Sequence, residues 1–309
     1  MSTGRGYAKI ILFGDHFAVY GIPVIATAID KYVEIKAEKI NENDIIFDDK
    51  IFHERISKKN NPNHINNKLF DAMFSDLNLN RVKFTISGTA IPKAGMGYSA
   101  AFNVALARAV SGYLKLNWSN QEINKISYKG ECVSHGTSSG IDNACATYKS
   151  LLWFEKKLEK KEDKIVPLKI KTELVLVLGD SKIAHNTKKI ISSVKRRAKK
   201  DSDKFGKILA EANEIVLEAK KSLEEKDLEK IGFLMNKNHK LLKQIGVSCP
   251  ELEKLIDIVL ANKALGAKIT GAGDGGLIVA LCENEKRQEL LAKEIEKEGF
   301  GAIKIKLCY

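Results

Sequence analysis

The residues that say most about chemistry form a glycine loop in front of a helix-forming run. Residues 92–102 read PKAGMGYSAAF, and the run extends from Ser99 to Leu116. Gly95 and Gly97 let the backbone turn tightly and approach a ligand closely, because glycine has no Cβ. The helix would direct unpaired N–H groups and the positive end of its dipole toward the loop. The pattern predicts a phosphate-binding loop, with the Ser99 hydroxyl available to a metal ion, and a plain turn is the alternative.

Three further sets of polar residues lie far from this loop in the sequence, and each contains groups that phosphate chemistry uses. Neither the G-x-x-x-x-G-K-[ST] loop nor a dinucleotide-binding glycine fingerprint is present, so two common phosphate-binding classes are excluded. The sets are Lys9 with Asp15 and His16 around the end of an apolar strand, Glu131 with Asp142 across a glycine-rich turn, and the loop GAGDGG at 271–276.

Composition and charge argue against several classes of protein. The chain has no apolar run of the length a membrane span needs, and its five cysteines are scattered without a C-x-x-C pair, which is typical of reduced thiols in the cytoplasm. The net charge of +12 suggests an anionic partner. However, the basic stretch 188–200 contains no aromatic residues on which bases could stack, so we expect neither nucleic acid nor membrane as a partner.

The elements that must position these residues suggest two α+β domains. A chain of 309 residues predicts two domains, which we place at 1–165, with the phosphate-binding loop, and at 166–309. The charged segment 155–164 is expected to be a linker or a hairpin tip. Strands are expected at 9–13, 24–39, 81–87, 151–154, 174–178, 277–281 and 301–307, and helices at 99–116, from 119 toward 131, and at 186–200, 203–224, 227–244, 250–263 and 285–298.

Together these motifs resemble those of the GHMP kinase superfamily and, within it, the mevalonate kinases. Residues 9–21 read KIILFGDHFAVYG, where the family has K-V-I-L-F-G-E-H-A-V-V-Y-G, and residues 95–101 read GMGYSAA for G-L-G-S-S-A-A. The segments around Glu131 to Asn143 and Gly266 to Gly273 match two later motifs. The resemblance covers nearly the whole chain, and it implies an N-terminal domain like ribosomal protein S5, a ferredoxin-like C-terminal domain and a site in the cleft between them.

The resemblance also implies roles for single residues in an ATP- and Mg²⁺-dependent phosphorylation of the mevalonate 5-hydroxyl. Asp142 would accept the proton of the attacking hydroxyl, and Lys9 would stabilise the charge that develops. Ser99 and Glu131 would hold Mg²⁺. The nucleotide-binding residues would be Lys93, Ala94, Gly95, Met96, Gly97, Tyr98, Ser99 and Ala100, and the acceptor-binding residues Asp15, His16, Thr187, Gly271, Ala272 and Gly273. The oligomeric state stays open, with a homodimer as one option.

The chain departs from the family pattern at Tyr98, where serine is usual, at Asp274, where glycine is usual, and at Asp15, where glutamate is common. These changes leave other functions open. One alternative is a kinase of the same family that acts on a phosphorylated mevalonate or a sugar. A second is a non-catalytic relative that only binds ligands. A decarboxylase of this superfamily is less favoured, because Lys9 stands where those enzymes are expected to lack it.

Overall fold

The structure is a computed structural model that describes residues 1–309 except 93, 136–138, 157–162, 171–172, 185–186 and 309. The chain packs into two compact units, each built from separate segments. Residues 1–9, 28–92 and 97–149 form the first unit, and residues 10–27, 93–96 and 150–309 form the second. The long strands β1 (Ser2–Phe13) and β2 (Val24–Lys39) each contribute residues to both units. The division at residue 165, which follows position along the chain, stays a prediction.

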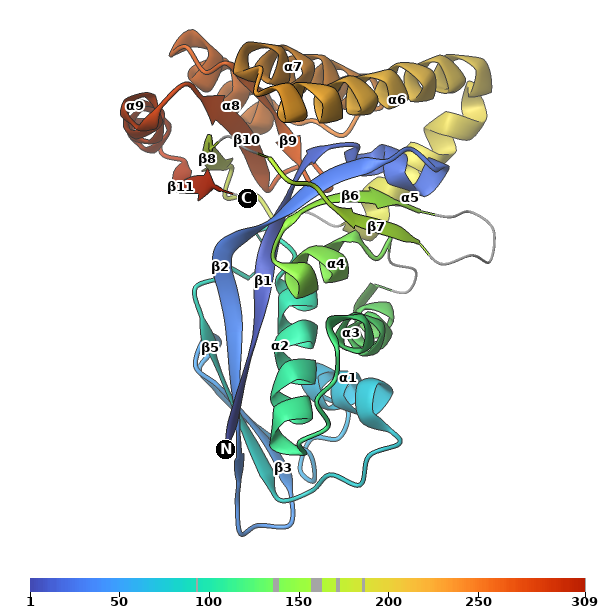
Figure 1. The fold of residues 1–309 in the computed structure, drawn as a ribbon, viewed down its shortest axis with the longest axis vertical. Helices are drawn as coiled ribbons and strands as arrows, with labels where there is room; N and C mark the ends of the chain where they lie inside the picture. The colour runs from blue at the N-terminus through green and yellow to red at the C-terminus, as the bar shows by residue number, and fades with distance from the viewer. Residues whose placement is uncertain (93, 136–138, 157–162, 171–172, 185–186, 309) are drawn as a thin grey trace. The chain divides into compact units, whose positions relative to one another are not determined.

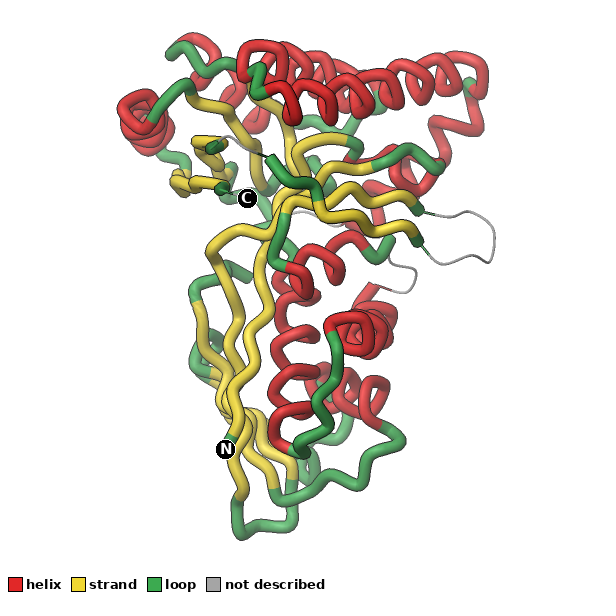
Figure 2. The backbone as a smooth tube through the Cα atoms, in the orientation of Figure 1, coloured by secondary structure: helices red, strands yellow, loops and turns green. Residues whose placement is uncertain are grey.

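The first unit has a layer of strands and a layer of helices (Figures 1 and 2). Its strands run in the order β4 (Glu54–Ser57), β3 (Ile45–Asp49), β5 (Val82–Gly88) and β2, which also pairs with β1. In the β2–β5 ladder, Ile35 lies opposite Ile86 and Ala37 opposite Phe84, so alternate apolar residues of both strands lie in the core. The helices are α1 (Ile65–Phe74), α2 (Tyr98–Tyr113), α3 (Asn120–His135) and α4 (Ile141–Tyr148).

Helix α2 is the centre of the first unit. It packs against α3 and α4, and α3 packs against α1. Most of its residues are buried, which is typical of a helix that is apolar on nearly every side. Strand β1 lies directly on it, because a Cβ at Gly6 would come 2.0 Å from the carbonyl oxygen of Ala101. The glycine therefore allows β1 to bring Lys9, three residues later, beside the first turn of α2.

The second unit is built on an antiparallel sheet with the order β11 (Gly301–Leu307), β8 (Leu174–Asp180), β10 (Leu277–Cys282) and β9 (Gly266–Thr270). Strands β8 and β10 are continuous apolar runs, because both of their faces are covered. Helices α7 (Leu228–Gln244), α8 (Pro250–Ala261) and α9 (Glu285–Lys297) pack on the sheet (Figure 1). Helix α6 (Ser202–Glu225) packs on α7 and contacts α5 (Thr187–Lys200).

The remaining part of the second unit is the start of β2 with two shorter strands. Residues 24–27 of β2 pair with β6 (Leu151–Glu155), which pairs in turn with β7 (Lys164–Pro167). The charged segment 155–164 thus joins two paired strands, so of the two expectations the hairpin is confirmed and the linker is wrong. The short 3₁₀ helix η1 (Asp15–Tyr20) follows β1. Among the described helices, none combines the length and the apolar composition that a membrane crossing requires.

The α+β class predicted from the sequence is confirmed, and most boundaries agree within a few residues. A capping box lies at the start of α3, since Glu122 accepts from the Ser119 N–H at 2.8 Å and the Glu122 N–H donates to the Ser119 hydroxyl. Three local predictions were incomplete. β1 begins at Ser2, α1 lies in a segment for which the sequence predicts no helix, and Asp142 lies in the first turn of α4 at the end of the glycine-rich turn.

We predict that Gly6→Ala destabilises the protein by about 3 kcal/mol or more, because the new methyl group would meet the backbone of α2. Gly206→Ala is the matched control. Gly206 lies within α6 with no atom near the position of a new Cβ, so alanine should stabilise that helix by up to about 1 kcal/mol. Urea unfolding of both variants measures the difference, and equal effects would contradict the packing of β1 on α2.

Candidate functional site

An ion pair between Lys9 and Asp142 is the first part of the candidate site. Lys9 is 4% exposed, and its Nζ lies 3.1 Å from Oδ1 of Asp142. Gly97, the N-cap of α2 with a φ of +72°, lies beside this pair. A Cβ on Gly97 would come 3.1 Å from Cγ of Lys9 and 3.5 Å from Oδ2 of Asp142. The start of α2, the strand β1 and the start of α4 therefore meet at this glycine.

A second pair, Ser99 and Glu131, lies in the same unit. The Ser99 hydroxyl donates to Oε2 of Glu131 at 3.0 Å and lies 3.3 Å from the hydroxyl of Ser134, one helical turn after Glu131 on α3. Glu131 is 3% exposed. Burial, together with the negative charge of Asp142, raises the pKa of Glu131 to about 7. A cation beside Glu131 would favour the charged form of the carboxylate and would offset the cost of its burial.

This arrangement suits a phosphate group and a hard cation. The N–H groups in the first turn of α2 have no acceptor within the helix, so they and the helix dipole attract an anion. Ser99 and Glu131 offer the oxygen ligands that Mg²⁺ prefers. Among the described residues, no group of three or more histidine, cysteine, aspartate and glutamate side chains could hold a metal ion by itself. Mg²⁺ takes only one or two protein carboxylates when it binds together with phosphate groups, so the oxygen donors of Ser99 and Glu131 fit it.

Tyr98, the departure from the family pattern, packs against another aromatic ring. Its ring meets the ring of Phe52 edge-on, with the centroids 6.0 Å apart. The turn that carries Phe52 is capped by Asp49, whose Oδ1 accepts from the N–H of Ile51 at 2.8 Å and of Phe52 at 3.0 Å. Burial raises the pKa of the Tyr98 phenol, and its hydroxyl has no hydrogen-bond partner among the described residues.

In the second unit, a buried ion pair joins the end of β1 to the glycine loop at 271–276. Nζ of Lys268 lies 2.6 Å from Oδ2 of Asp15, and both side chains are fully buried. The other oxygen of Asp15 accepts from the N–H of Gly271 at 3.2 Å. The hydroxyl of Thr270 accepts from the N–H of Ile11 at 2.8 Å. These contacts tie Asp15 to the loop and hold the loop in place, and the role of Asp15 in binding an acceptor stays a prediction.

His16 meets the same loop. Its Nε2 lies 2.7 Å from the carbonyl oxygen of Ala272. A carbonyl oxygen can only accept, so Nε2 carries the proton and Nδ1 is the acceptor nitrogen of the neutral ring. Burial lowers the pKa of His16 below its ordinary value, although Ala272 and Asp15 oppose the shift, so the ring is neutral at pH 7. His16 can therefore accept a hydrogen bond from a hydroxyl group.

The two glycine loops approach each other in the second unit. A Cβ on Gly271 would lie 3.4 Å from the carbonyl oxygen of Gly95. Gly273 has a φ of +77°, and a Cβ there would come 2.0 Å from the carbonyl oxygen of Val247. Val247 also accepts from the N–H of Asp274 at 2.8 Å. The loop thus depends on glycine at a position where any side chain would strike the backbone.

The other expected site residues are placed as follows. Lys93 lies outside the described residues. Ala94, Met96 and Ala100 are buried around the first loop. Thr187 is the first residue of α5 and is partly exposed, and none of the described contacts joins it to either group of site residues. The structure therefore gathers Lys9, Asp142, Ser99 and Glu131 in one unit, and Asp15, His16 and the residues 271–273 in the other.

Two residues that contact the site were not identified from the sequence. Lys268 pairs with Asp15, and Asn103 donates its Nδ2–H to Oε2 of Glu131 at 3.3 Å. The signal for Lys268 is a lysine within the apolar strand β9, where a charged residue needs a buried partner. The signal for Asn103 is an amide four residues after Ser99 in an otherwise apolar helix.

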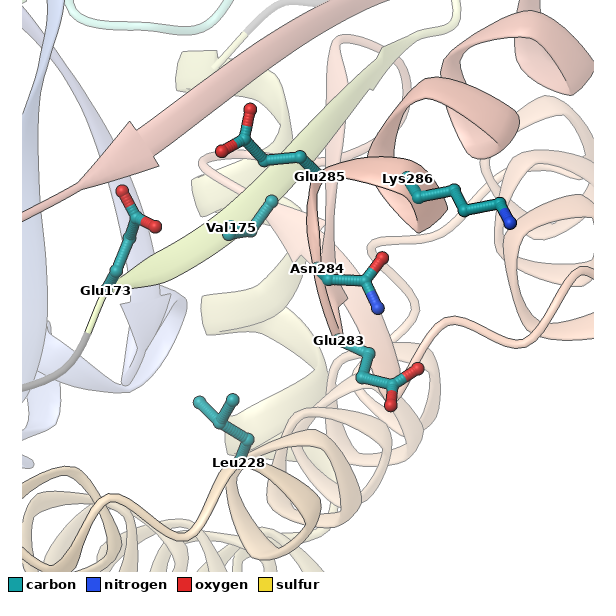
Figure 3. A pocket seen from close by; sticks show the side chains of 7 residues that line it. All are labelled: Glu173, Val175, Leu228, Glu283, Asn284, Glu285 and Lys286. Carbon is teal, nitrogen blue, oxygen red and sulfur yellow. The ribbon is translucent and has the colours of Figure 1, made fainter.

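A surface pocket of the second unit is not part of the candidate site. Figure 3 shows its lining, which consists of Glu173, Val175, Leu228, Glu283, Asn284, Glu285 and Lys286. Three carboxylates make it unsuited to a phosphate group, and two of them are paired with Lys306, at 3.3 Å for Glu173 and 2.6 Å for Glu285. None of the residues in the two groups described above lines this pocket.

Comparison with known proteins assigns both halves of the chain to one family. The model described as GHMP kinases N terminal domain matches residues 63–150, and the model described as GHMP kinases C terminal matches residues 219–301. The mevalonate kinase of Pyrococcus furiosus is 34% identical over 95% of this chain and 96% of its own length. The mevalonate kinase of Methanocaldococcus jannaschii is 32% identical over 94% of this chain and 95% of its own length.

Solved structures agree with this result. The crystal structure of L. major mevalonate kinase in complex with R-mevalonate has a TM-score of 0.88 and 28% sequence identity to this chain. The match covers 100% of this chain and 96% of the other. The similarity in sequence and in fold therefore extends along the full length of both proteins.

We predict that Lys268→Met destabilises the protein by about 3–5 kcal/mol, because it leaves the buried carboxylate of Asp15 without its cation. The double variant Asp15→Asn/Lys268→Met should recover most of this loss, since both charges are then removed. Lys304→Met is the control, because the Lys304–Glu289 pair is exposed and worth at most about 1 kcal/mol. Urea unfolding gives the three values, and a double variant as unstable as Lys268→Met would contradict the role of the pair.

Replacing Tyr98 by phenylalanine should leave stability unchanged or raise it by about 1 kcal/mol, because the buried hydroxyl has no partner among the described residues. The KM for ATP should not change. Thermal unfolding and steady-state kinetics check the two statements. A large rise in the KM for ATP would mean that the hydroxyl bonds the nucleotide.

Proposed function

The chain belongs to the GHMP kinase family as a member of its mevalonate kinases, and we propose that it transfers the γ-phosphoryl group of ATP to the 5-hydroxyl of mevalonate. The observation that carries this proposal is the Lys9–Asp142 pair beside the start of α2, in the unit that also holds Ser99 and Glu131. A proton acceptor, a cation and oxygen ligands for a metal ion are the groups that phosphoryl transfer needs.

In the proposed reaction the hydroxyl oxygen of the acceptor bonds to the γ-phosphorus, and the bond from that phosphorus to the leaving oxygen of ADP breaks. Asp142 accepts the proton that the hydroxyl loses. The ammonium group of Lys9, 3.1 Å from that carboxylate, lowers the pKa of the hydroxyl and stabilises the negative charge on the transferred group. Its burial strengthens both effects, because water is excluded from around the charge.

The nucleotide would be held by main-chain groups rather than by many side chains. The residues from Ala94 to Ala100 surround the start of α2, where the first-turn N–H groups would donate hydrogen bonds to the phosphate oxygens. Mg²⁺, held by Ser99 and Glu131, would supply positive charge to the phosphate oxygens when bound. Tyr98 would shape the wall of this region through its contact with Phe52.

We propose that the residues gathered in the second unit, Asp15, His16 and the loop 271–273, bind the acceptor. The Nδ1 atom of neutral His16 can accept a hydrogen bond from a hydroxyl group of mevalonate. In the loop, Ala272 and Gly273 carry main-chain N–H groups, whereas the N–H of Gly271 already donates to Asp15. Asp15 fixes this loop through Gly271 and Lys268, and it belongs to the proposed acceptor site. Thr187, the first residue of α5, remains a candidate for binding the acceptor substrate.

An acceptor panel tests the proposal. Purified protein with Mg·ATP is incubated with mevalonate, with phosphorylated mevalonates and with simple sugars, and ADP release is measured by a coupled assay. We expect turnover with mevalonate and not with the others. Release of ADP with a phosphorylated mevalonate or a sugar alone would assign another acceptor, and release with none would favour a protein that binds ligands without catalysis.

The roles of the ion pair are tested by Asp142→Asn and Lys9→Met. We expect Asp142→Asn to lower kcat by about 10²- to 10⁴-fold, because the proton acceptor is lost. Lys9→Met should lower kcat by about 10²- to 10³-fold, since one stabilising charge is removed. Circular dichroism and thermal unfolding confirm that each variant is folded. Activity near that of the unsubstituted protein in either variant would refute the assignment.

A further inference from the structure

Two residues of α2 donate hydrogen bonds to the same oxygen of Glu131. Ser99 donates its hydroxyl to Oε2 at 3.0 Å, and Asn103 donates its Nδ2–H to Oε2 at 3.3 Å. The two donors are four residues apart, so they lie on the same face of the helix. Asn103 is fully buried. One face of α2 therefore fixes the position of the carboxylate on α3.

The asparagine is an unfavourable choice for stability at this position. Its Oδ1 atom is buried and has no hydrogen-bond partner among the described residues. A buried amide oxygen without a partner destabilises the folded chain, whereas leucine, a side chain of similar size, would bury no polar group there. The burial of Asn103 thus calls for a reason other than packing.

The residue before Glu131 makes room for this asparagine. A Cβ on Gly130 would lie 2.8 Å from Oδ1 of Asn103 and 2.8 Å from Sδ of Met73. Glycine in the interior of a helix is less stable than alanine. Gly130 lies within α3, so the chain has a second residue that lowers stability and whose effect is to let Asn103 reach Glu131.

We propose that Asn103 is the positioning residue of the metal-binding carboxylate, and that Gly130 is required because it leaves the space that the Asn103 carboxamide occupies. The inference rests on the proposed assignment of Glu131 to Mg²⁺. Groups that hydrogen-bond a ligating carboxylate orient it, and their loss typically weakens metal binding by about 10- to 100-fold. Asn103 acts on the metal through Glu131 and touches neither the nucleotide nor the acceptor.

The test is direct binding of Mn²⁺, a spectroscopic substitute for Mg²⁺, to the full chain with ADP. Electron paramagnetic resonance gives the amount of free Mn²⁺, and calorimetry gives ADP binding without metal. Asn103→Leu should weaken Mn²⁺ binding by about 10- to 100-fold, leave metal-free ADP binding unchanged and leave the melting temperature equal or higher. Mn²⁺ affinity within twofold of the unsubstituted protein would overturn the proposal.

A double-mutant cycle with Gly130→Ala adds a second measurement. In the unsubstituted background the new methyl group displaces the carboxamide, so Mn²⁺ binding should weaken as in Asn103→Leu. In an Asn103→Ala background the carboxamide is absent and only the contact with Sδ of Met73 remains, so Gly130→Ala should have little further effect on Mn²⁺ binding. Equal effects of Gly130→Ala in both backgrounds would overturn the proposal. If the unsubstituted protein itself binds no Mn²⁺ with ADP, the proposed function fails first, and the two failures are thereby distinguished.

Discussion

The structure of the first unit depends on holding two carboxylates next to a buried ammonium group. Glu131 and Asp142 repel each other, and burial raises the pKa of Glu131 to about 7. The ion pair with Lys9 and the hydrogen bonds from α2 offset part of this cost. Each charged group comes from a different element, so β1, α3 and α4 must all pack against α2. The tight contacts of this unit follow from that requirement, including the approach of β1 to the α2 backbone at Gly6.

The second unit meets a similar demand with a closed ion pair. The side chains of Asp15 and Lys268 are fully buried, so each charge depends on the other for compensation. The pair helps to join the end of β1 to the glycine loop. At the same place His16 bonds the carbonyl oxygen of Ala272, and the N–H of Gly271 bonds Asp15. A buried pair of this kind contributes little net stability when compared with apolar residues, but either partner alone is costly. Its value here is that the loop and His16 have one defined position.

Much of the candidate site could be predicted from the sequence, because the motifs depend on local order. The loop before α2, the capping box at Ser119 and the strand that carries Lys9 follow from glycine, caps and apolar runs within short windows. The partners of Asp15 and Glu131 could not be predicted in this way. A lysine within an apolar strand and an amide in a buried helix each indicate a buried partner, but only the packed structure shows that Lys268 pairs with Asp15 and Asn103 with Glu131.

Tyr98 and Asp274 depart from the family pattern, but neither changes the contacts of these charged groups. Tyr98 directs its ring to Phe52, on a turn that Asp49 closes by local hydrogen bonds, and its neighbour Ser99 still bonds Glu131. Asp274 is exposed, and its main-chain N–H bonds Val247, so its charge is solvated and the loop keeps its course. Both substitutions are thus accommodated by their surroundings. A chain that had lost catalysis would have no need to retain the costly burial of Lys9 and Glu131, and this chain retains both.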